Sequence, residues 1–186
     1  MLHARNVVLG TVAGAATVGF LAGVATGGAR KLAAQAITTA GRFDWLDALK
    51  SEHRQVDMVF KLLEKTSEQD VNKRKAGIQK IEYALTKHAV EEENIIYPAL
   101  RETDQEMAAK HLYEDHSDIK TLIFELKELP KDDPRWLPRL QALAELVRKH
   151  VREEEDEIYP AFKAKMTDEQ NARLSKSMQA MGVKVG

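Results

Sequence analysis

Apolar residues recur along four stretches of the chain at alternating steps of three and four residues, which is the period of an amphipathic α-helix. The first stretch places Leu46, Leu49, His53, Val56, Phe60 and Leu63 on one helical face. The corresponding positions of the other three stretches are Ile78, Ile81, Leu85, His88, Glu92 and Ile95 or Ile96; Leu112, His116, Ile119, Ile123 and Leu126; and Leu143, Leu146 or Val147, His150, Glu154 and Ile158. The pattern predicts four amphipathic helices, each with a histidine on its apolar face.

Short polar or proline-containing segments separate the predicted helices. The polar stretch 66–70 follows the first helix, and the segment 129–134 follows the third. Tyr97-Pro98 is expected to interrupt the second helix near its end, because proline has no amide hydrogen to donate. Short links between long helices favour an all-α fold, an antiparallel up-down four-helix bundle over residues 42–166.

A further helix is expected after the bundle. The sequence TDEQ at Thr167–Gln170 has the form of a capping box, in which the first and fourth residues satisfy each other's backbone amides. Residues 167–186 are therefore predicted to form a short C-terminal helix and tail.

The N-terminal segment, residues 1–41, has a different composition from the bundle. Residues 7–29 carry no charge, but six of the 23 are glycine and six are alanine. This length suffices to cross a bilayer, and three GxxxG steps would let such helices approach closely. Three interpretations stay open: a membrane-inserted helix that self-associates, a cleaved signal peptide, or a small-residue helix in a soluble homo-oligomer. The segment predicts membrane association, and otherwise a cytoplasmic protein.

Net charge and cysteine content exclude several classes of function. The formal net charge is −1, so no basic excess is present to bind a nucleic-acid backbone, and we expect no nucleic-acid partner. The chain has no cysteine, which excludes disulfides, iron–sulfur clusters and thiolate metal sites. A metal bound to this chain would be held by histidine, carboxylate or tyrosine.

The bundle sequence contains an internal repeat. KHAVEEENIIYPAL at residues 87–100 returns as KHVREEEDEIYPAF at 149–162, with nine of the fourteen aligned positions identical. His53 lies 35 residues before His88, and His116 lies 34 before His150. The bundle therefore reads as a duplicated helix pair, and each pair supplies one histidine and then a His-x-x-x-Glu motif.

Six ionisable residues on apolar helix faces predict a metal site. A lone histidine in a core is usually a hydrogen-bonded structural residue, but a buried carboxylate without a partner costs several kcal/mol. His88 and Glu92 stand about one helical turn apart on one face, and His150 and Glu154 repeat that geometry. A dinuclear metal cluster would satisfy all six residues, with imidazoles as terminal ligands and the carboxylates as bridges. A structural bundle whose polar core residues pair only with each other is the alternative.

This order of motifs resembles the hemerythrin-like (HHE cation-binding) family over about residues 43–164. The resemblance implies a four-helix bundle around a non-haem di-iron centre with an oxo or hydroxo bridge; manganese or zinc is less expected than iron. It further implies that the terminal ligands are His53, His88, His116 and His150, and that Glu92 and Glu154 are the bridges.

One position departs from the oxygen-carrying members of that family. They have a further histidine one turn before the ligand of the third helix, and Leu112 occupies this position here. His111 is expected to face outward. The missing imidazole is expected to leave an open coordination position, or one filled by water or by a side chain such as Tyr113. A site with an open position favours reaction with O2, H2O2 or NO over reversible oxygen carriage.

Several residues besides the six predicted ligands, most of them near the two His-x-x-x-Glu motifs, are expected to have structural roles. The acidic residues beside the motifs are expected to form solvated faces, with one of them able to hold an imidazole: Glu91, Glu93, Glu153, Glu155 and Asp156. Tyr97 and Tyr159 are expected to cap the core, and Trp45 and Trp136 to pack within it.

Two functional hypotheses follow. The first is a di-iron protein that binds or reacts with small oxidants in defence or sensing, with peroxide or NO consumption as its enzymatic form. The second is a non-enzymatic iron-binding or sensor module coupled to a membrane or oligomeric assembly through residues 1–41.

Overall fold

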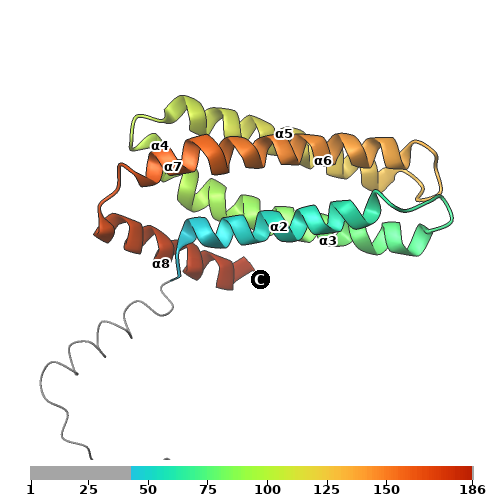
Figure 1. The fold of residues 1–186 in the computed structure, drawn as a ribbon, viewed down its shortest axis with the longest axis horizontal. Coiled ribbons are helices and arrows are strands. Elements are labelled where there is room, and N and C mark those ends of the chain that lie inside the picture. The colour runs from blue at the N-terminus through green and yellow to red at the C-terminus, as the bar shows by residue number, and fades with distance from the viewer. Residues whose placement is uncertain (1–42, 186) are drawn as a thin grey trace, which may run out of the picture. The chain divides into compact units, whose positions relative to one another are not determined.

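The computed structural model describes residues 43–185, and these form helices without a strand. Four long helices make an antiparallel bundle, and their bounds are α2 Trp45–Leu63, α3 Val71–Glu91, α5 Glu106–Glu128 and α6 Trp136–Arg152. The α2–α3 and α5–α6 links lie at one end of the bundle, and the links that follow α4 and α7 lie at the other (Figure 1). The predicted up-down four-helix bundle is confirmed.

The second and fourth bundle helices each continue through a π-helical segment. Glu92–Ile96 (η1) follows α3 and leads into α4, Tyr97–Arg101; Glu153–Ile158 (η2) follows α6 and leads into α7, Tyr159–Lys163. Tyr97-Pro98 was thus wrongly expected to interrupt the second helix. The extra residue in the π turn accommodates a proline, whose ring would clash with a carbonyl one turn earlier in a regular α-helix.

Local signals explain where the helices begin and end. The side chain of Asp44 caps α2 by accepting hydrogen bonds from the backbone amides of Leu46 (3.1 Å) and Asp47 (3.3 Å). At the other end of the bundle, Leu129 has an extended backbone before Pro130 and ends α5.

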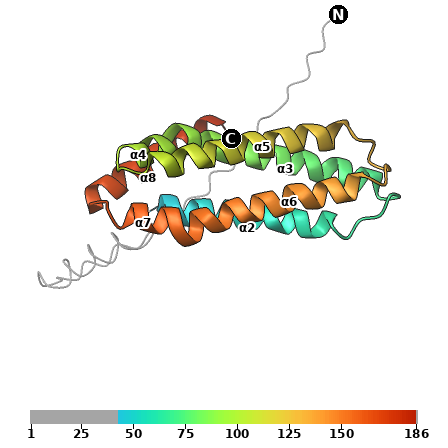
Figure 2. The same cartoon turned by 90° about the horizontal axis from the view of Figure 1, so that it is seen from above.

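The C-terminal helix α8, Asp168–Val185, packs on the bundle (Figures 1 and 2). Its capping box forms as predicted: the Gln170 amide donates to Thr167 Oγ1 (3.2 Å), and the Thr167 amide donates to Gln170 Oε1 (2.8 Å). The helix is fixed to the start of α2 by the buried Trp45, whose indole N–H donates to Asn171 Oδ1 (2.8 Å).

The hydrophobic core consists of two clusters with a polar layer between them. One contains Val56, Leu85, Ile119 and Val147 and extends toward the α2–α3 link. The other lies toward α8 and includes Leu49, Ile96, Leu112 and Tyr159. Along each bundle helix, the histidine of the apolar face lies between residues of the first cluster and residues of the second. The fold therefore gathers the polar residues into one layer that is closed off on both sides.

The predicted N-terminal helix, residues 7–29, lies outside the described residues. Within residues 43–185, no helix is both long and apolar enough to cross a membrane. Membrane association and GxxxG-mediated assembly remain predictions about residues 1–41.

Candidate metal centre

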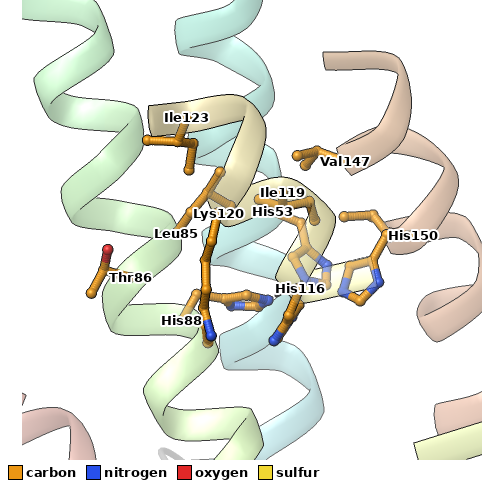
Figure 3. Close-up of a pocket in the computed structure, with 12 residues that line it drawn as sticks. His53, Leu85, Thr86, His88, His116, Ile119, Lys120, Ile123, Val147 and His150 are labelled. Atoms are coloured by element: carbon orange, nitrogen blue, oxygen red, sulfur yellow. Dashed lines mark hydrogen bonds between the residues drawn. The ribbon is translucent and has the colours of Figure 1, made fainter. Parts of the chain in front are cut away.

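The structure brings all six predicted site residues into the central polar layer. Their donor atoms form two groups of four, namely His53, His88, Glu92 and Glu154, and Glu92, His116, His150 and Glu154. All six residues are buried, and both glutamates are fully buried. Figure 3 shows the four histidines converging from α2, α3, α5 and α6 on one space. Because both groups include the same two carboxylates, the arrangement has the form of a two-cation site with two shared ligands.

Distances between the inward-facing atoms match the spacing of ligands on a common cation. His53 Nε2 and His88 Nε2 are 3.0 Å apart, and His88 Nε2 is 3.0 Å from Glu92 Oε2. Two donors about 2.1 Å from one cation at a right angle would be about 3.0 Å apart.

The second group has similar spacings. His116 Nε2 lies 3.3 Å from Glu92 Oε2, and His150 Nε2 lies 3.2 Å from Glu154 Oε1. The other oxygen of Glu154 is 3.4 Å from His53 Nε2. Each carboxylate therefore contacts imidazoles of both groups.

A carboxylate holds the outer nitrogen of every site histidine. The four contacts from Nδ1 are His53 to Glu155 (2.7 Å), His88 to Glu52 (3.1 Å), His116 to Glu93 (2.9 Å) and His150 to Asp115 (3.3 Å). The set follows the duplication of the sequence. The acidic residue before the first histidine of each helix pair holds the second histidine of that pair. The acidic residue after each buried glutamate holds the first histidine of the other pair.

The four carboxylates that contact Nδ1, here called the outer carboxylates, help to show whether the site can hold a metal ion. A carboxylate accepts the Nδ1 proton and so directs the Nε2 lone pair of a neutral imidazole toward the centre. Two such lone pairs 3.0 Å apart, at His53 and His88, repel unless a proton or a cation lies between them. In the same layer, His150 Nε2 and Glu154 Oε2 are buried without a hydrogen-bond partner among the described residues. The donor set therefore fits two divalent cations.

The electrostatics of the protein without metal lead to the same conclusion. Burial favours neutral forms, but the charge of Glu92 raises the pKa of His88 well above its usual value, and the charge of Glu154 raises that of His150 to about 10. Burial would likewise raise the pKa of Glu92, yet the nearby charge of His88 holds it well below its usual value. His53 is the exception, because burial and the charge of His88 lower its pKa. The two carboxylates thus attract positive charge into the layer, which protons or metal ions can supply.

Two tyrosine hydroxyls lie in the centre of the site. Tyr159 Oη is 2.5 Å from Glu92 Oε1 and 2.7 Å from Glu154 Oε1. Tyr97 Oη is 3.1 Å from Glu154 Oε1 and 3.0 Å from His116 Nε2. Burial, together with the charges of the two carboxylates, raises the pKa of both phenols well above the usual value, so both stay protonated and donate.

The π-helical segments place these tyrosines in the site. Each tyrosine follows its glutamate by five residues, and its backbone amide bonds to the carbonyl of that glutamate, Tyr97 to Glu92 and Tyr159 to Glu154. A bond over five residues widens the turn, so that residues five apart come onto one face. Both tyrosines belong to the core cluster toward α8, as expected. Their contacts with the glutamates were not predicted, since an α-helical wheel places them away from those residues.

Sequence reasoning missed part of the outer set of carboxylates. Glu93 and Glu155 were considered as solvated residues that could hold an imidazole, and both do so. Glu52 and Asp115 were not singled out. The signal was present in the sequence, because an acidic residue precedes the first histidine of each helix pair.

The structure also shows the positions of Leu112, His111 and Tyr113, at and beside the point where the sequence differs from the oxygen-carrying members of the family. Leu112 is buried in the core cluster toward α8, and His111 is half-exposed with Nε2 2.9 Å from Glu153 Oε2, so it faces outward as expected. Tyr113 does not fill an open position in the site. Its hydroxyl donates to the backbone carbonyl of Glu93 (2.8 Å). In a π-helical turn this carbonyl would accept from the backbone amide of residue 98, but that residue is a proline and has no N–H.

A small cavity adjoins the four imidazoles. Its volume is about 30 Å³, and two exposed residues, Thr86 and Lys120, are among those that line it. Apolar side chains from α3, α5 and α6 form most of the remaining wall: Leu85, Ala89, Ile119, Ile123, Val147 and Val151. This volume is comparable to the space taken by one water molecule. The cavity therefore suits ligands of two or three non-hydrogen atoms.

A family model described as the hemerythrin HHE cation binding domain matches residues 45–162. The chain belongs to this family. The match spans the whole bundle and includes all six predicted site residues, so the hemerythrin-like resemblance found in the sequence is confirmed.

Individual relatives of this hemerythrin-like chain are distant. It is 28% identical over 139 residues to a DNA nickase of Nostoc sp., covering 75% of this chain and 39% of that protein. It is 25% identical over 137 residues to an uncharacterized hemerythrin-like protein of Schizosaccharomyces pombe, covering 72% and 66% of the two chains. The crystal structure of a hemerythrin HHE cation-binding domain-containing protein from Mycobacterium kansasii superposes with a TM-score of 0.66 at 20% identity, covering 76% of this chain and 86% of that one. This last likeness shows a shared fold.

Proposed function

We propose that this hemerythrin-like chain binds two iron ions in the central layer and reacts there with a small oxidant, O2, H2O2 or NO. The observation that carries the proposal is the sharing of two buried carboxylates between two groups of inward-facing imidazoles. In this assignment Glu92 and Glu154 bridge the two ions. The terminal ligands are His53 and His88 on one ion and His116 and His150 on the other.

The choice of iron rests on the family and the ligand type. Imidazole and carboxylate also bind manganese and zinc, so the ligands alone do not select one metal. Two iron ions would supply electrons and Lewis acidity toward a small oxidant.

The protein's own residues supply orientation, protons and space for a small ligand. The outer carboxylates fix the imidazole rings, and the protonated hydroxyls of Tyr97 and Tyr159 provide hydrogen-bond donors within about 3 Å of both glutamates. The cavity of about 30 Å³ beside the imidazoles offers space for a small molecule. These features favour a small oxidant over an organic substrate.

The metal content of the full chain, purified aerobically without added metal, tests the proposal first. About two irons per chain, with near-ultraviolet absorption from a bridged ferric pair, would support it. One zinc or no metal would reject the iron chemistry. A purely structural layer predicts that a chelator leaves the melting temperature unchanged, whereas a metal centre predicts a lower one, because binding energy is linked to folding.

Turnover separates an enzyme from a sensor. The iron-loaded chain is mixed with a hundredfold excess of H2O2 or NO, and its consumption is followed. Loss of many equivalents per chain indicates an enzyme. A spectral change with about one equivalent consumed indicates a sensor or binding module, which is the alternative that residues 1–41 motivated.

The expected absence of a nucleic-acid partner remains a prediction. The description DNA nickase belongs to the Nostoc relative, of which this chain covers 39%. Incubation of the full chain with supercoiled plasmid, with and without iron and H2O2, checks the prediction. Nicking of the plasmid that depends on the six residues of the metal centre would contradict it.

A further inference from the structure

A second, larger hollow lies on the surface beside the metal centre. It is a cleft of about 400 Å³ between α2 and α6, which run side by side (Figure 2). Four basic residues line it: Arg54, Lys61, Arg148 and Arg152. Two carboxylates line it as well, Asp57 and Glu155, so cations outnumber anions in a chain whose net charge is −1. This volume lies in the range of small-molecule binding sites.

Two of the four cations are already paired. Arg148 bonds to Asp57 Oδ1 and to Glu64 Oε1, both at 2.8 Å, and Lys61 pairs with Asp57 Oδ2 at 2.6 Å. Asp57 is therefore shared by two cations, and Glu155 contacts His53 through one oxygen.

The other two cations, Arg54 and Arg152, are exposed on the rim of the cleft. Within residues 43–185, neither makes a hydrogen bond or an ion pair. A guanidinium presents parallel N–H donors that match the oxygens of a phosphate or a carboxylate.

The base of the cleft is apolar and is shared with the small cavity beside the imidazoles. Val147, Val151 and His53 line both spaces, and Phe60 lies below the cleft. Val151 is half-buried, whereas Phe60, Val147 and His53 are buried. Figure 3 shows Val147 and His53 at the edge of the small cavity. A ligand in the cleft would therefore rest on apolar side chains, with its acidic group toward the rim and its body one side chain from the metal centre.

We propose that this cleft binds a small organic anion, with Arg54 and Arg152 holding its phosphate or carboxylate group and with Val151, above the buried Val147 and Phe60, contacting its apolar part. The site goes beyond the proposed reaction with oxidants. The two arginines that would hold the anion lie outside the six central residues, although His53 lines the base of the cleft. An anion bound there would lie against the face of α2 that carries His53.

Fluorescence anisotropy of flavin mononucleotide, with riboflavin as the matched ligand without phosphate, tests the site on the full chain. Flavin mononucleotide is expected to bind saturably, and riboflavin at least tenfold more weakly. The double variant Arg54→Gln/Arg152→Gln is expected to weaken flavin mononucleotide at least tenfold. The control Lys75→Gln/Lys80→Gln removes the same charge from the exposed surface of α3 and should bind as the unaltered chain does.

Competition identifies the acidic group. Displacement by phenyl phosphate indicates a phosphate ligand, and displacement by terephthalate indicates a carboxylate ligand; either result supports the site. Equal binding of the two flavins, unchanged binding by the arginine variant, or no saturable binding of any probe would overturn it. The titrations are run on iron-loaded and chelator-treated protein, so that a missing metal centre and a missing anion site give different results.

Discussion

The hydroxyl of Tyr159 lies 2.5 Å from Oε1 of Glu92, although the two residues belong to different halves of the duplicated sequence and stand 67 positions apart. The contact joins the π-helical end of one helix pair to the carboxylate of the other. It adds a donor from the other half to a fully buried carboxylate that also accepts from Tyr97 of its own half (3.2 Å).

Tyr159→Phe is expected to destabilise the metal-free chain by about 1–3 kcal/mol, because a buried carboxylate loses a short hydrogen bond. Urea unfolding of chelator-treated protein measures the change. Tyr113→Phe is the control, since it removes a hydroxyl that donates to a neutral backbone carbonyl. If the control loses as much free energy of unfolding or more, the contact of Tyr159 with Glu92 does not stabilise the fold more than an ordinary buried hydroxyl does.

Glu92→Ala is expected to remove both irons, because one carboxylate oxygen contacts the imidazoles of both groups. The iron content should fall from about two per chain to near zero. Asp156→Ala, which removes an exposed carboxylate from η2, should keep its iron. Retention of two irons by the Glu92 variant would contradict the bridging assignment.

Glu93→Ala should weaken iron binding by about 10–100-fold, because His116 loses the carboxylate that fixes its ring and its Nδ1 proton. Competition with a calibrated ferrous chelator measures the affinity. The matched variant is Glu153→Ala, which removes the acidic residue next to the other buried glutamate. Glu153 contacts His111 and Lys149 and none of the four site histidines, so its loss should change the affinity little.

Asp44→Ala is expected to cost about 1 kcal/mol at pH 7, because α2 loses its N-cap. Burial alone would raise the pKa of Asp44, but its bonds to Lys163 and Asn171 hold it below the model-compound value of 3.8. A carboxyl whose pKa is lowered by folding stabilises the fold above the unfolded pKa and loses that contribution as the pH falls through the folded pKa.

The stability difference between the Asp44 variant and the unaltered chain should accordingly shrink as the pH falls below 3.8. Urea midpoints at neutral pH and near pH 3 give the comparison. A difference that stays constant across this range would show that the charge of Asp44 contributes nothing.

Periodicity and motif order were sufficient to predict the bundle and its six central residues. A histidine or glutamate on the apolar face of an amphipathic helix must point inward, because apolar burial fixes the rotation of the helix. The duplication then placed the four histidine-bearing turns at one level, and the structure brings all six residues together. The capping box of α8 could likewise be predicted from the sequence, since its two hydrogen bonds join residues three positions apart.

Only the tertiary structure decided what surrounds those six residues. The contacts of Glu52 and Glu93 with imidazoles of other helices depend on how neighbouring helices are rotated and offset, which no local pattern records. The contacts of the two tyrosine hydroxyls with the glutamates were missed because a wheel of α-helical period cannot anticipate two π turns. The basic cleft joins residues about a hundred positions apart, so its charge became visible only when α2 and α6 were side by side.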